Sequence, residues 1–129
     1  MDILLETASN NDWEMDVAWV VKGGQDPLAW IKRYGSRINA VHVKDIAPAG
    51  ENLNEDGWAD VGHGTLDWKN LLAEAKAKGA ELAVLPEYFC FMGHQDADKL
   101  LLAETPGLGT VQDFLSDAAR DLKLWVVGG

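Results

Sequence analysis

The 129-residue sequence predicts a small α/β protein built on a parallel β-sheet. Three observations support this fold class. Short apolar runs that are typical of strands alternate with segments of helical periodicity, which gives the order β-α-β-α-β-α-β. The run at 82–85 is apolar throughout, as in a parallel strand that is covered on both faces. The length and a hydrophobic fraction of 47% fit a single domain that spans residues 1–129.

The first predicted unit is a strand, a helix and a second strand. Residues 13–21 are rich in Val and Trp and stop before a glycine pair, which predicts a strand. The helix begins at Asp26, a residue suited to an N-cap, and Gly35 is suited to end it. A strand follows at 38–43. The segment 2–7 (DILLET) fits either the end of a helix or an extra strand.

The second half continues this alternation after a long interruption. The regular pattern lapses between residues 45 and 64, and a loop of this length is usually functional or mobile. Strands that alternate with helices pair in parallel through right-handed crossovers. The later predicted elements are a helix at 67–78, a strand at 82–85, a short helix at 96–104, a helix from Thr110 to about residue 122 and a strand at 124–127.

Four such units form either an open twisted sheet or half of an eight-stranded barrel. Half a barrel leaves two strand edges without a partner, and unpaired edges favour pairing with another chain. The sequence therefore predicts a homodimer in which a second copy completes the fold.

The composition excludes several classes of partner. A formal net charge of −10 repels phosphate backbones, so no nucleic-acid partner is expected. No apolar run approaches the ~18 residues of a membrane span, and no secretory signal is apparent. The lone cysteine, Cys90, excludes an internal disulfide framework and fits a reducing compartment. We therefore expect a cytoplasmic protein that acts on a small molecule.

Three ionisable residues fall near the carboxyl ends of predicted strands, where ligands gather in parallel α/β folds: Asp16, His42 and Glu87. Neighbouring strands lie about 4.8 Å apart, so their side chains can converge on one ion. Oxygen and imidazole ligands suit a divalent metal such as Zn²⁺, Mn²⁺, Co²⁺ or Mg²⁺. His63 and His94 are candidate further ligands in loops. Each residue also has a structural alternative, as a core histidine, a cap or a solvated loop residue.

The segments MDVAWVVKGGQDPLAW (15–30), AVHVKD (40–45) and VGHGTLDW (61–68) resemble the sugar phosphate isomerase/epimerase family with the xylose-isomerase-like barrel. The resemblance covers residues 2–78 and corresponds to the C-terminal part of that barrel. It implies that Asp16 and His42 bind a divalent metal together with two glutamates from other strands. The strand that carries the first of those glutamates has no counterpart in this sequence. Trp19 also stands where many members have a substrate-binding histidine.

The residues that follow resemble a second family. The segments KGAELAVLPEYFCFMGHQDADKLLLAE (78–104) and TPGLGTVQDFLSDAARDLKLWVVGG (105–129) are similar to the N-terminal part of the nitrilase, or carbon–nitrogen hydrolase, superfamily. This resemblance implies that Glu87 is a general base. The catalytic lysine and cysteine of that family lie further downstream, and Cys90 does not match the cysteine motif. The sequence therefore predicts a chimera with its junction at 73–82.

Three functions remain open at this point. The first is a metal-dependent hydrolase in which metal-activated water attacks a small phosphoester or activated ester, with Asp16 and Glu87 as catalytic residues. The second is sugar isomerisation or epimerisation at the same metal site, which needs a base on either side of the substrate. The third is a folded chimera without catalytic activity.

The orientation of Glu87 is a separate condition for the metal site. A shift of one residue along a strand turns a side chain to the opposite face of the sheet, so Glu87 needs a bulge, or a bend at Pro86, to face the metal.

Overall fold

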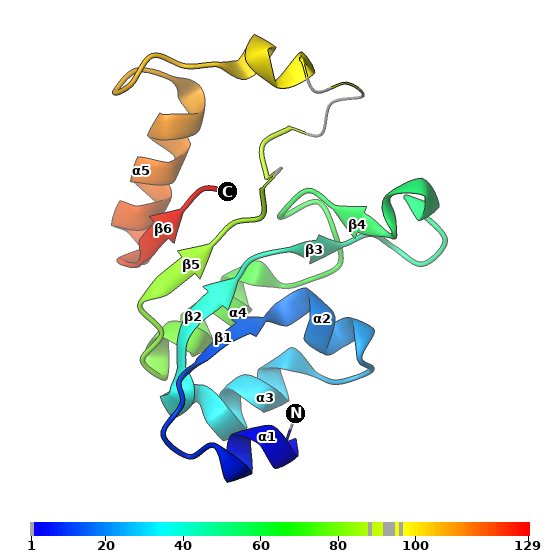
Figure 1. The fold of residues 1–129 in the computed structure, drawn as a ribbon, viewed down its shortest axis with the longest axis vertical. Coiled ribbons are helices and arrows are strands. Elements are labelled where there is room, and N and C mark those ends of the chain that lie inside the picture. Colours follow the sequence, from blue (N-terminus) through cyan, green and yellow to red (C-terminus); the bar gives the residue numbers. More distant parts are fainter. Residues whose placement is uncertain (1, 88, 92–94, 96) are drawn as a thin grey trace.

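The computed structural model describes residues 2–87, 89–91, 95 and 97–129, and its main sheet has four parallel strands in the order β1-β2-β5-β6 (Figure 1). Each strand pairs in parallel with the next, and β1 and β6 are the two edges. The predicted fold class is therefore confirmed, whereas completion by a second copy stays a prediction. The strands are β1 (Trp13–Asp16), β2 (Ile38–His42), β5 (Leu82–Val84) and β6 (Trp125–Val127).

Helices connect these strands at the predicted places. Asp26 begins the first of them as expected, since its Oδ1 accepts a hydrogen bond from Leu28 N at 2.9 Å. Asp67 caps the second through Asn70 N at 3.2 Å. No helix in the described part of the chain has both the length and the apolar character needed to cross a membrane. The three connecting helices are α3 (Pro27–Tyr34), α4 (Trp68–Ala77) and α5 (Thr110–Leu122).

The buried core lies on one face of the sheet. Met15, Val41 and Ala83 are paired across three strands, and each is at most 3% exposed. Ile31 of α3 and Leu71 of α4 belong to the same buried cluster. Burial of apolar side chains at about 25 cal/mol per Å² is the main stabilising term for such a layer.

The strand predicted at 13–21 is wrong beyond its first four residues. Strand β1 ends at Asp16, and the chain turns directly into α2 (Val17–Lys22). Oδ1 of Asp16 accepts a hydrogen bond from Trp19 N at 3.0 Å, which satisfies one of the free donors at the start of the helix. The Val- and Trp-rich composition favours a strand, but the cap and the complete burial of Val17 stabilise the helix.

The segment 2–7 forms a helix, α1 (Asp2–Thr7), which decides between its two predicted alternatives. The guanidinium of Arg37 donates hydrogen bonds to the carbonyl oxygens of Leu5, Ala8 and Asn11. Because a helix leaves its last carbonyl groups without partners inside the helix, Arg37 holds this terminus against the rest of the chain.

The region 45–64, predicted to lack regular structure, contains an antiparallel ribbon of β3 (Asp45–Ile46) and β4 (Trp58–Ala59). Two-residue strands are too short for an alternation signal, so the sequence pattern did not reveal them. The described part of the helix predicted at 96–104 is a 3₁₀ turn instead. The 3₁₀ turns are η1 (Gly35–Arg37), η2 (Leu53–Glu55) and η3 (Asp98–Leu102).

Helix α5 is capped from a distance, because its own N-cap position is occupied by Gly109. The carboxylate of Glu104 accepts hydrogen bonds from Val111 N at 2.7 Å and Gln112 N at 3.1 Å. The bond from Val111 is the main reason why the pKa of Glu104 lies below its ordinary value; burial opposes this shift. A Cβ at residue 109 would lie 2.0 Å from Cδ of Glu104, so a larger residue there would displace the carboxylate that caps α5.

Glu104→Gln is expected to lower the free energy of unfolding at neutral pH. Since the folded-state pKa is lowered, the carboxylate stabilises the fold above the ordinary glutamate pKa, and this stabilisation is lost as pH falls through the lowered value. Urea denaturation at neutral and acidic pH should show a wild-type–variant difference that shrinks on acidification. Exposed Glu51→Gln is the matched control, and a difference independent of pH would contradict the assignment.

Candidate functional site

Asp16 and His42 lie side by side at the ends of neighbouring strands β1 and β2. The parallel register pairs these two residues, and Nδ1 of His42 lies 2.9 Å from Oδ2 of Asp16. Their side chains are 24% and 26% exposed, respectively, so both can be reached from solvent. The structure thus brings two of the predicted site residues into direct contact.

This contact orients the imidazole of His42. An ionised carboxylate only accepts hydrogen bonds, so the proton in the contact belongs to Nδ1, and Nε2 is left as the acceptor nitrogen. Nε2 has no hydrogen-bond partner among the described residues. The other oxygen of Asp16 accepts from Trp19 N. The Asp16–His42 pair is therefore arranged to act as a general base through Nε2.

An aromatic hollow of about 580 Å³ lies beside this pair and includes Asp16 in its wall. The rings of Trp13 and Trp30 pack edge to face there, with their centroids 5.7 Å apart. Trp19 is 58% exposed and lines the same hollow. Apolar walls with a few polar groups are typical of sites that bind small organic molecules.

Lys44 lies on the same side of the chain as His42. The backbone stays extended past β2, since Val43 N donates to Val84 O at 2.7 Å and burial alternates from residue 41 to 47. Residues two apart in such a segment project to one side, about 7 Å apart. The ammonium of Lys44 lies 3.7 Å from the ring centre of Trp58 and has no hydrogen-bond acceptor among the described residues.

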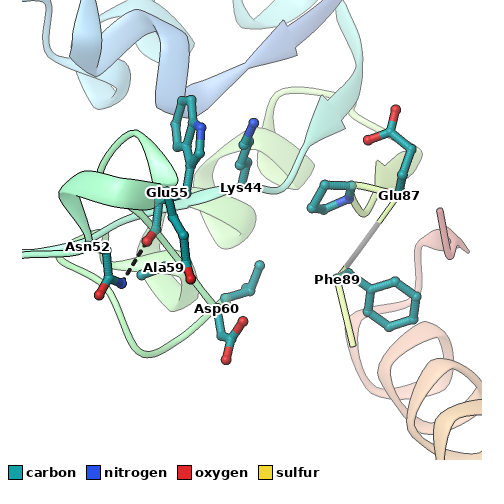
Figure 2. A pocket seen from close by; sticks show the side chains of 10 residues that line it. Lys44, Asn52, Glu55, Ala59, Asp60, Glu87 and Phe89 are labelled. Carbon is teal, nitrogen blue, oxygen red and sulfur yellow. Dashed lines mark hydrogen bonds between the residues drawn. The ribbon is translucent and has the colours of Figure 1, made fainter. Parts of the chain in front are cut away.

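Glu87 is exposed just after β5 and lines a second cavity, of about 180 Å³. Figure 2 shows Lys44 between the two walls of this cavity, with Asn52 and Asp60 on one side and Glu87 and Phe89 on the other. The structure therefore groups Glu87 with Lys44. Its predicted role as a general base stays a prediction.

The described residues contain no group of three or more His, Cys, Asp or Glu side chains that could hold a metal ion. Asp16 and His42 lie together, whereas Glu87 lines the other cavity. His63 is exposed in the turn that precedes α4. His94 lies outside the described residues. The divalent metal and its three protein ligands therefore stay predictions.

Asp45 is a structural residue that the sequence analysis missed. Its side chain is fully buried, and its carboxylate accepts hydrogen bonds from four backbone N–H groups. The donors are Ile46, Gly62, Gly64 and Leu66, at 2.8, 2.9, 3.2 and 3.2 Å. These bonds hold the turn that follows the β3–β4 ribbon against the first residue of β3. The only signal in the sequence was a carboxylate directly after a strand, because three of the donors are distant along the chain.

Comparison with known families gives one match. The family model described as carbon-nitrogen hydrolase matches residues 46–129, which is more than half of the chain and includes Glu87. The match begins upstream of the predicted junction at 73–82. No curated protein and no solved structure matches the chain. The isomerase/epimerase resemblance of residues 2–78 and the chimeric origin therefore stay predictions.

Proposed function

Because the chain belongs to the carbon–nitrogen hydrolase family, we propose that it is a hydrolase that cleaves a small amide or activated ester with water activated by His42. Family membership supports the hydrolase class. The finer proposal depends on one observation, the 2.9 Å contact between Nδ1 of His42 and Oδ2 of Asp16. That contact leaves Nε2 to accept a proton from water.

In the proposed reaction, Nε2 of His42 removes a proton from water as the oxygen attacks the substrate carbonyl carbon. Asp16 stabilises the imidazolium that forms, through the hydrogen bond at Nδ1. The ammonium of Lys44, on the same side of the chain, favours the negative charge that develops on the carbonyl oxygen. The protonated His42 then returns the proton to the leaving amine or alcohol, and the bond to the leaving group breaks.

The walls of the two cavities limit the substrate class. The tryptophan-lined hollow beside Asp16 favours a small substrate with an apolar or aromatic group. Lys44 in the second cavity favours a polar carbonyl or phosphoryl oxygen. Phosphoesters therefore remain in the substrate class, next to amides and carboxylic esters.

A bound divalent metal belongs to the finer proposal, and its fit to the described residues is incomplete. Nε2 of His42 is a suitable metal ligand. Both oxygens of Asp16, however, already accept hydrogen bonds. Glu87 lines a different cavity. The reaction proposed above therefore uses only water and side chains of this chain. Elemental analysis tests whether the site binds a metal. If it does, protein purified without added metal should contain Zn, Mn or Co, and the variants Asp16→Ala and His42→Ala should lose that metal. Unchanged metal content in both variants would exclude this site.

A substrate panel tests the proposal. Chromogenic carboxylic esters, small amides and phosphate esters are offered to the purified chain, with and without added Zn²⁺ or Mn²⁺, and ketose–aldose conversion is followed in parallel. Cleavage of an ester or amide that increases with enzyme concentration is the expected result. Sugar isomerisation without ester or amide cleavage would favour the isomerase alternative, and inactivity throughout would favour the non-catalytic one.

A further inference from the structure

Trp58 of the β3–β4 ribbon lies against two lysines. The ammonium groups of Lys22 and Lys44 are each 3.7 Å from the centre of the Trp58 ring. Lys22 is the last residue of α2, whereas Lys44 lies between β2 and β3, so three separate segments of the chain meet here. The two ammonium groups therefore lie no further apart than twice 3.7 Å. At such a distance two like charges repel each other.

No carboxylate of the described residues neutralises this pair of charges. Neither lysine forms an ion pair within the described part of the chain, although the sequence has 21 acidic and only 11 basic residues. Lys22 uses one of its three N–H donors, in a hydrogen bond of 2.5 Å to the carbonyl oxygen of Asp56. Lys44 uses none of its donors among the same residues. The ring of Trp58 attracts both ammonium groups but leaves their remaining donors available to an anion.

The remaining donors suit a carboxylate. Hydrogen bonds from an ammonium to a carboxylate are about 2.8 Å long, so the two oxygens of one carboxylate can reach both lysines. A bound anion also offsets the repulsion between the two ammonium groups. Lys44 lines the second cavity, whose walls carry three further carboxylates that repel additional negative charge; these are Glu55, Asp60 and Glu87 (Figure 2). A singly charged carboxylate is therefore favoured over a doubly charged phosphate.

The lysines lie next to the aromatic hollow beside Asp16. Trp58 lines the second cavity and Trp19 lines the hollow, and the two rings pack edge to face with their centroids 5.4 Å apart. The ammonium of Lys22 is 5.7 Å from the centre of the Trp19 ring. Since Trp19 is 58% exposed, an apolar group attached to a bound carboxylate can contact it.

We infer that Lys22, Lys44 and Trp58 form a binding site for a small monocarboxylate whose apolar part lies against Trp19. The carboxylate accepts hydrogen bonds from both ammonium groups. Both lysines precede residue 46, where the match to the carbon–nitrogen hydrolase family begins. Binding at this site does not depend on the proposed hydrolysis. Where both hold, the substrate carries a carboxylate that Lys22 selects, and Lys44 has enough donors to serve the carboxylate and the reacting carbonyl oxygen.

Titration of the purified chain with phenylacetate, followed by NMR of the indole N–H groups, tests this site. Phenylacetate should shift the Trp58 signal, which is identified by its absence in Trp58→Phe. The uncharged 2-phenylacetamide should bind more weakly by about fivefold or more. Lys22→Gln and Lys44→Gln should each weaken phenylacetate binding by a similar factor, whereas Lys22→Arg keeps the charge and should retain most of it. Lys69→Gln is the matched control, since Lys69 is exposed and lines neither cavity.

The backbone amide spectrum checks that each variant is folded. If Lys22→Gln disrupts the ribbon by losing the bond to Asp56, Lys44→Gln decides alone. Equal affinity for phenylacetate and 2-phenylacetamide, or no shift with either, would overturn the inference, as would unchanged affinity in both folded variants. Tighter binding of phenyl phosphate than of phenylacetate would overturn the choice of a monocarboxylate. Because no catalysis is measured, a chain without hydrolase activity leaves this test unaffected.

Discussion

Asp45→Asn is expected to lower the free energy of unfolding by about 3–5 kcal/mol. The Asp45 carboxylate is fully buried and accepts four backbone N–H groups. The amide of asparagine replaces one oxygen by an N–H₂ group, which then faces N–H donors and leaves them unsatisfied. Since native domains are stable by only about 5–15 kcal/mol, a loss of this size removes a large part of the total.

Urea denaturation followed by circular dichroism measures this loss. Asp60→Asn is the matched control, because Asp60 is an exposed aspartate in the same region and should change the midpoint little. A variant Asp45→Asn with wild-type stability would show that the buried carboxylate does not hold the turn. Gly64→Ala should act in the same direction, since a Cβ there would lie 2.2 Å from Oδ1 of Asp45.

Asp16→Asn is expected to lower kcat for ester or amide hydrolysis by about 10²–10⁴-fold. Asparagine is also a good N-cap, so its carbonyl oxygen can keep the bond from Trp19 N that begins α2. Its N–H₂ group then faces Nδ1 of His42, which must act as acceptor. The proton of the neutral imidazole moves to Nε2, and His42 can no longer take a proton from water there.

The rate is measured with an activated carboxylic ester under saturating conditions. Glu81→Gln serves as the control, because Glu81 is an exposed carboxylate next to β5 that lines neither of the two cavities. Equal thermal unfolding of both variants separates the loss of a base from the loss of the fold. An Asp16→Asn variant with wild-type kcat would remove Asp16 from the mechanism.

The sequence predicted a helix or strand correctly where the contact that stabilises it joins residues close together in the sequence. Asp26 caps α3 through a residue two positions away, so the N-cap pattern sufficed there, and α4 was predicted from the helical periodicity of its apolar residues. The parallel order followed from alternation of strands and helices. The segment 17–22 was assigned wrongly, because its composition favours a strand while burial and the Asp16 cap stabilise a helix.

The candidate site was predictable to the extent that it depends on strand order. Asp16 and His42 stand at the ends of neighbouring parallel strands, and this alone suggested their proximity. The position of Glu87 depends on how the chain bends after Val84, which periodicity does not encode. The role of Asp45 and the cation–aromatic contact of Lys44 depend on the fold of the ribbon region, whose short strands gave no pattern.

The most direct test of the central claim is kcat/KM for an activated ester or small amide, measured with wild type, His42→Gln and Glu87→Gln in parallel. If His42 activates the water, His42→Gln loses about 10²-fold or more and loses more than Glu87→Gln does. Wild-type kcat/KM in a folded His42→Gln variant, together with loss of activity in Glu87→Gln, would contradict the claim. The catalytic base would then be the glutamate of the carbon–nitrogen hydrolase part of the chain.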